Sequence, residues 1–234
     1  MSAEQRFKDD VVSRIPIQVL AHNEWFNAPV FYDSLAAFVQ PNTRAVRKIL
    51  EEASDILHNQ TSSGSLDAYQ RGPERAALIA AAVYEALRAR GIQYISPPAS
   101  FENTGQKVRT TAQVLDERFG TCIDLAVTYA ACIEQTGLHP LIWLVDGHAF
   151  TGFMLNEESL AHTSLTETNT LVNLFESHKA IAVEALYYEQ GPEGAFRNAV
   201  DAARRHFANP ATLRAVIDVS TARRDGVRPL PTAF

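Results

Sequence analysis

Apolar positions recur at helical spacing along the first half of the chain. Residues 43–60 and 73–91 place apolar side chains every three or four positions, and both stretches are punctuated by Pro, Gly or Arg, so each predicts a helix. A short helix is expected at 111–118 and a longer, almost wholly apolar one from Thr121 onward. Residues 193–208 predict a further amphipathic helix.

Short apolar, β-prone runs follow the central helix. Residues 141–145 and 148–155 are separated only by Asp146-Gly147, a strong signal for a tight hairpin. Residues 180–188 and 213–220 predict two more strands. A helical front half followed by antiparallel strands predicts an α+β domain.

Composition limits the class of protein. Apolar residues make up 46% of the 234, so the chain can bury a sizeable core without disulfides or metals. The net charge of -6 argues against a nucleic-acid-binding surface over the whole domain, and no stretch reaches the roughly 18 apolar residues of a membrane span. The polar N-terminus predicts no signal peptide. We expect three parts, namely a helical part at 1–98, a core at 99–225 and a tail or linker at 226–234.

The only two cysteines are Cys122 and Cys132. On one helix they would lie about 15 Å apart along the axis, whereas a disulfide needs Cα atoms within about 7 Å. Two unpaired thiols indicate a reducing, cytoplasmic setting.

Cys122 stands where a helix is expected to begin. Thr121 is a good N-cap, and Asp124 completes a capping-box-like pattern with it. The unpaired N–H groups and the dipole of the first turn favour a thiolate at that position. The alternative is that Cys122 is a small buried hydrophobe, which is also our expectation for Cys132.

A cysteine nucleophile needs a base and a third group that orients it. His148 follows the Asp-Gly turn and is the candidate base. Glu184 is a charge inside an apolar run, either paired with the base or outward-facing on an edge strand. Asp146 is explained by the turn, and Asp218 is a reserve acid. The other histidines are weaker candidates, being His22, His58, His139, His162, His178 and His206.

The stretch 120–150 resembles the core of the transglutaminase-like superfamily of papain-like cysteine enzymes. The pattern there is Gly-x-Cys-x-Asp opening a helix, then His-Ala-aromatic on a strand, then an acid on a later strand. The chain departs from it twice, with Phe where Trp is more usual and Glu where Asp is commoner. The matching residues are Gly120, Cys122, Asp124, His148, Ala149, Phe150 and Glu184.

A closer resemblance covers most of the chain. Segments including "SLDAYQRGPERA" and "VIDVSTARRDGVRPLP" are similar to a transglutaminase-like domain of large bacterial proteins, often found beside a superfamily 1 helicase module. The resemblance implies that Gln106 is an oxyanion donor, its alternative being a loop residue. Lys107 and Arg109 are expected in loop or surface contacts, or against an acidic substrate.

The leading hypothesis is therefore a cysteine hydrolase that attacks a peptide or isopeptide amide through Cys122, His148 and Glu184. The alternative is a catalytically inactive interaction or sensor module of the same fold. A metal site is disfavoured because one thiolate and one imidazole are a poor ligand count, and no cofactor is expected. We expect a protein or peptide substrate, with no direct nucleic-acid or membrane contact. The polar segment 156–170 is either a lid or plain surface.

Overall fold

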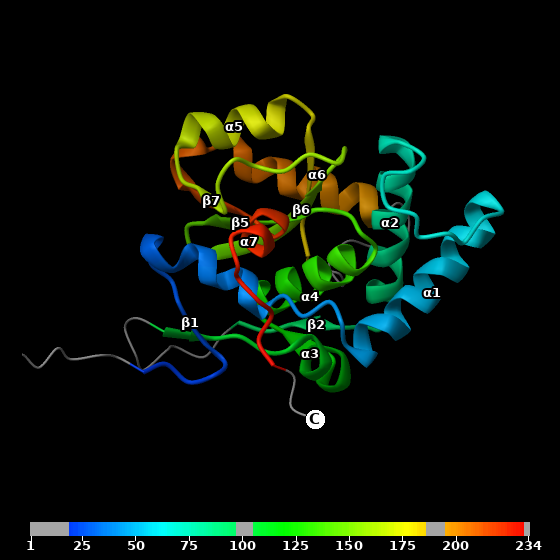
Figure 1. The fold of residues 1–234 in the computed structure, drawn as a ribbon, viewed down its shortest axis with the longest axis horizontal. Coiled ribbons are helices and arrows are strands. Elements are labelled where there is room, and N and C mark those ends of the chain that lie inside the picture. Colours follow the sequence, from blue (N-terminus) through cyan, green and yellow to red (C-terminus); the bar gives the residue numbers. More distant parts are fainter. Residues whose placement is uncertain (1–18, 97–104, 186–194, 232–234) are drawn as a thin grey trace, which may run out of the picture.

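A five-stranded antiparallel sheet in the order β7-β9-β5-β6-β8 organises the second half of the molecule (Figure 1). The computed structural model describes residues 19–96, 105–185 and 195–231. The N-terminal stretch, the paired prolines at 97–98 and the end of the predicted strand at 186–188 lie outside these ranges. The strands of the sheet are β5 (Pro140–Val145), β6 (His148–Met154), β7 (Ser164–Leu165), β8 (Ala180–Val183) and β9 (Leu213–Asp218).

Two further strand pairs lie outside this sheet. β1 pairs with β3 in antiparallel register, and β2 pairs with β4 in parallel register. Their bounds are β1 (Glu24–Phe26), β2 (Gln93–Tyr94), β3 (Gly105–Lys107) and β4 (Phe119–Gly120).

Helices surround the sheet and fill the first half of the chain. Figure 1 shows α4 at the centre, α1 and α2 together at one side, and α5 beyond the sheet from α4. The α-helices are α1 (Arg44–Thr61), α2 (Pro73–Ala89), α3 (Thr111–Glu117), α4 (Cys122–Gln135), α5 (Thr168–Glu176), α6 (Ala195–Phe207) and α7 (Val219–Arg224), and the 3-10 helices are η1 (Pro29–Phe38) and η2 (Pro210–Thr212).

The sheet is buried on both faces. Alternate residues of β5 belong to two different apolar clusters, with Ile142 and Leu144 in one and Leu141 and Trp143 in the other. The first cluster also contains the apolar residues of α1, α2 and α4, and the second contains those of α5 and the end of α6. Because successive side chains of a strand point to opposite faces, β5 reads as a continuous apolar run.

The structure confirms the predicted α+β class. The hairpin forms at Asp146-Gly147, where Gly147 has a φ of 70° that a residue with a Cβ rarely adopts. Within the described residues, no helix is both long and apolar enough to span a bilayer.

The predicted strand 213–220 is wrong at its end. β9 stops at Asp218, because the Asp218 carboxylate accepts hydrogen bonds from the N–H groups of Ser220 and Thr221 at 2.8 and 3.0 Å and caps α7. The polar segment 156–170 contains β7 and the start of α5. In the predicted tail, the Leu230 N–H donates to the Ala37 carbonyl at 2.7 Å and so joins it to η1.

Candidate functional site

The amino end of α4 is fixed by a capping box. The Asp124 N–H donates to the Thr121 hydroxyl at 3.5 Å, and the Asp124 carboxylate accepts from the Thr121 N–H at 3.0 Å. Cys122 is the first residue of the helix and keeps 8% of its surface exposed. The first N–H groups of a helix have no partner within it, so the site around the sulfur is rich in donors.

Asp124 also holds the segment that follows β3. Its carboxylate accepts from the Arg109 N–H at 2.7 Å and from Arg109 Nη1 at 3.0 Å, although Asp124 is fully buried. Gln106 lies in β3, opposite Trp25 of β1. The residue predicted as a helix cap therefore also connects α4 to the strand that carries Gln106. Arg109 is bound to Asp124, whereas Lys107 is exposed.

The structure brings Cys122, His148 and Glu184 together. His148, the first residue of β6, bonds through Nε2 to Glu184 Oε2 at 2.9 Å and lines the same cavity as Cys122. Burial by itself lowers the pKa of His148, but the hydrogen bonds and negative charges of Cys122 and Glu184 raise it to about 10. Nε2 is occupied by the carboxylate, which leaves Nδ1 as the ring nitrogen for the thiol.

Glu184 directly follows the edge strand β8 and points inward, with 4% of its surface exposed. Burial raises the pKa of this carboxyl, and the hydrogen bonds and charges of His148 and His206 outweigh that effect and lower the pKa. The second oxygen accepts from the Ala185 N–H at 2.9 Å. A buried carboxylate with partners on both oxygens is the environment that keeps it ionised.

The candidate site opens into a cavity of about 290 Å³. Gln106, Cys122 and His148 line it together, and Trp25, Tyr32 and Tyr94 give it aromatic walls. Its other lining residues are Asn27, Ile123, Leu144, Val145, Asp146, Gly147, Ala149 and Arg214. The cavity therefore presents the thiol and the imidazole to whatever enters it.

Both alternative acids have structural roles. Asp146 Oδ2 accepts from Arg214 Nη2 at 2.6 Å at the cavity rim. Asp218 caps α7 and also accepts from the Leu160 N–H at 2.7 Å. Neither bonds to His148 among the contacts of the described residues.

Cys132 lies on the same helix in a different environment. It is fully buried among apolar side chains, and this burial raises the pKa of its thiol well above the ordinary value. The packing role expected for Cys132 agrees with these surroundings.

His206 on α6 is the site residue that sequence reasoning passed over. Its Nε2 lies 3.1 Å from Glu184 Oε2, and its ring stacks on Phe150. One signal was present, because position 206 lies seven residues after Ala199 and three after Ala203, on the apolar side of an amphipathic helix. That pattern does not predict that the Glu184 carboxylate lies against the His206 ring.

His148, Glu184 and His206 also form a set of possible metal ligands, with donor atoms all within 4.8 Å of one another. Two imidazoles and a carboxylate are ligands that Zn²⁺ accepts. In this arrangement the Glu184 oxygen is already shared between the two rings through hydrogen bonds.

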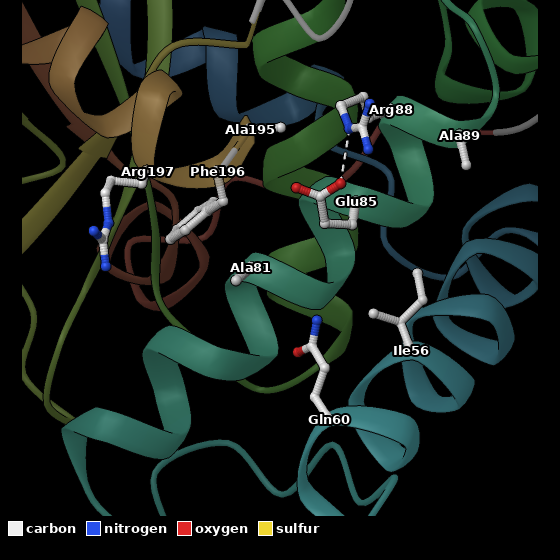
Figure 2. Close-up of a pocket in the computed structure, with 9 residues that line it drawn as sticks. All are labelled: Ile56, Gln60, Ala81, Glu85, Arg88, Ala89, Ala195, Phe196 and Arg197. Carbon is white, nitrogen blue, oxygen red and sulfur yellow. Dashed lines mark hydrogen bonds and ion pairs between the residues drawn. The ribbon is translucent and has the colours of Figure 1, made fainter. Parts of the chain in front are cut away.

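A second cavity, of about 710 Å³, lies away from this chemistry (Figure 2). It is formed by α1, α2 and the first turn of α6, and an ion pair between Arg88 and Glu85 stands in its wall. Ile56, Ala81 and Phe196 make much of its surface apolar. Among the described residues, none of those that line it is a cysteine, a histidine, a serine or a threonine.

Comparisons of the chain with family models, with curated proteins and with solved structures found no match.

Proposed function

We propose that this chain is a cysteine hydrolase of the transglutaminase-like, papain-like type, acting on a peptide or isopeptide amide. The observation that supports this most is that Cys122 and His148 line one cavity and that His148 is hydrogen-bonded to the buried Glu184. The chain order of cysteine, histidine and acid agrees with the resemblance described above.

In the first half-reaction the proton of the Cys122 thiol is held on His148, whose pKa of about 10 keeps the imidazole charged, and the sulfur attacks the amide carbonyl carbon to form a C–S bond. The negative charge moves to the carbonyl oxygen, where the Cys122 N–H and the Gln106 side-chain amide would stabilise it. The C–N bond then breaks, and His148 returns the proton to the leaving nitrogen. Glu184 keeps the imidazole oriented and stabilises its protonated form.

In the second half-reaction water attacks the thioester. His148 takes a proton from the water, the C–S bond breaks, and the proton passes to the sulfur, so that the acid product and the free thiol are restored. An amine in place of water would give amide transfer. We favour hydrolysis because water is always present.

We further propose, on the resemblance of the wider sequence, that the domain serves within or beside a bacterial helicase-type protein. Both cysteines are free thiols. This supports a cytoplasmic setting as part of the same proposal.

The second candidate function is an interaction or sensor module without catalysis. It draws support from the aromatic side chains of the cavity, which suit binding as well as chemistry. The two functions differ in what they require of Cys122.

The test is acylation by p-nitrophenyl acetate, followed by mass spectrometry of the intact protein. We expect one acetyl group on Cys122 that water removes with time, and no acetylation of a Cys122→Ala variant. Acetylation at Cys132, or alkylation of Cys122 that His148→Ala leaves unchanged at every pH, would support the module and reject the enzyme.

A further inference from the structure

The Glu184 carboxylate is shared by two imidazoles. Its Oε2 lies 2.9 Å from His148 Nε2 and 3.1 Å from His206 Nε2. An ionised carboxylate can only accept hydrogen bonds, so both ring nitrogens must carry a proton. His206 is thus a second hydrogen-bond donor to the oxygen that already accepts a hydrogen bond from His148.

The backbone fixes His206 in this position. The Glu184 N–H donates to the Ala199 carbonyl at 3.0 Å and so ties Glu184 to α6. His206 lies two helical turns beyond Ala199, hence on the same face of the helix. The contact depends on the docking of α6 against β8.

Ring stacking fixes the orientation of the His206 imidazole. Its centroid lies 4.6 Å from that of Phe150 with 15° between the planes, and 5.2 Å from that of His148 with 30° between the planes. Phe150 and His148 are both on β6. With the ring plane set by its neighbours, the Nε2 proton is directed at Glu184.

Glu184 is one methylene longer than the Asp that is commoner at such a position, and a longer side chain has more rotamers to restrict. Its two oxygens are held by His206 and by the Ala185 N–H. We propose that His206 is a positioning residue, whose Nε2–H holds the Glu184 carboxylate in the orientation that aligns the imidazole of His148. This inference rests on the proposed function.

The described residues place two ionisable groups against the carboxylate. His148 and His206 contact it, and the charge of Glu184 contributes, after burial and the charge of Glu85, to raising the pKa of the buried Tyr84 on α2. The charged neighbours of His206 on its own helix are Arg204 and Arg205, both exposed.

Two substitutions separate positioning from packing. The side-chain amide nitrogen of Gln reaches as far as Nε2 of His, whereas that of Asn reaches only as far as Nδ1. We therefore expect His206→Gln to acylate with p-nitrophenyl acetate at a rate within about threefold of wild type. His206→Asn should lose roughly ten- to a hundredfold, the size of loss seen when outer-shell partners of metal-ligating histidines are removed.

The second readout does not depend on catalysis. In a Cys122→Ala background, NMR titration of the His148 ring should give a lower pKa in His206→Asn than in His206→Gln, because the carboxylate is no longer held against the ring. Thermal melting of all variants identifies any loss from misfolding.

Equal acylation rates and equal His148 titration in the Asn, Gln and wild-type proteins would overturn the proposal. If His148 titration responds to His206→Asn but wild-type protein forms no acyl-enzyme, the positioning stands and the hydrolase fails. If acylation is present and neither readout responds, the hydrolase stands and the positioning fails.

Discussion

At its amino end α4 begins with Cys122, beside His148 and at the wall of a cavity. Ten residues later Cys132 is fully buried, and its thiol has a pKa raised by that burial. The residue type and the helix are the same, so the difference comes from the side chains that surround each end of the helix. One thiol faces a base and an entry path, and the other faces only apolar side chains.

The polar bonds at the two ends differ in the same way. At the amino end Asp124 binds Thr121 and Arg109 and thereby arranges the cavity wall. At the carboxyl end Glu134 accepts from Arg223 Nε at 2.8 Å, and Arg223 also donates to the Val39 carbonyl at 2.8 Å. The second set joins α4 to α7 and to the residue that follows η1, and neither Glu134 nor Arg223 lines the cavity that contains Cys122.

The largest difference between the two ends is expected when each thiol is removed in turn. Cys122→Ala should reduce labelling by a thiol-directed probe at least about a thousandfold, because it removes the proposed nucleophile. Cys132→Ala should leave labelling within about twofold and lower the free energy of unfolding by about 1 kcal/mol through lost packing. Labelling that follows Cys132, measured by mass spectrometry of tryptic peptides, would contradict the assignment.

Substitutions that break the ion pair at each end of α4 should separate an effect on stability from an effect on reactivity. Arg223→Ala and Asp124→Ala should each lower the free energy of unfolding by about 3 kcal/mol, since each leaves buried or half-buried polar partners unpaired. Only Asp124→Ala should also slow acylation. Urea unfolding measures the first effect, and Asp116→Ala, an exposed acid on α3, is the matched control. A slower acylation in Arg223→Ala would remove the distinction between the two ends.

Gln106→Ala should lower the rate of acylation by p-nitrophenyl acetate about a hundredfold, as loss of an oxyanion donor does. It should leave alkylation by iodoacetamide unchanged, because that reaction passes through no oxyanion. Lys107→Ala, the exposed neighbour on β3, should change neither rate. An unaltered acylation rate in Gln106→Ala would show that the donor is a different group.

The pairing of His148 and Glu184 predicts a pH dependence of stability. The pKa of His148 is raised from 6.5 to about 10, so its stabilising contribution is complete below about pH 6.5 and disappears as the pH rises toward 10. The lowered pKa of Glu184 gives a contribution that is present above about pH 4.5 and is lost as the pH falls.

The difference in melting temperature between wild type and His148→Asn should therefore shrink between about pH 6 and pH 10. His178→Asn, at an exposed position, serves as the control and should show no such trend. A difference for His148→Asn that stays constant over this range would show that the imidazole is not held in its charged form.

The smallest effect is expected at the cavity rim. Asp146 and Arg214 pair at 2.6 Å, but both side chains are about half exposed. Asp146→Ala should change the free energy of unfolding by less than about 1 kcal/mol, because water screens exposed pairs. The measurement is urea unfolding at low and high salt. A loss above 2 kcal/mol would mean that the rim is part of the core framework.

The sequence by itself determined the local elements of this protein. The capping residues around Cys122, the apolar periodicity of α1 and α2 and the Asp-Gly turn before His148 act over a few residues, and all three formed where the pattern predicts. The sequence pattern extends β9 too far because Val219 and Ser220 suit a strand, while the Asp218 side chain caps a helix in the same place.

The tertiary structure alone decided which of these elements meet. The sequence is compatible with a Glu184 that is either paired or outward-facing, and only the docking of α6 on β8 turns it inward against two histidines. His206 is separated from His148 by 58 positions in the sequence, and local periodicity carries no information about contacts at such distances. The tertiary packing likewise places Cys122 at a cavity and Cys132 among apolar side chains.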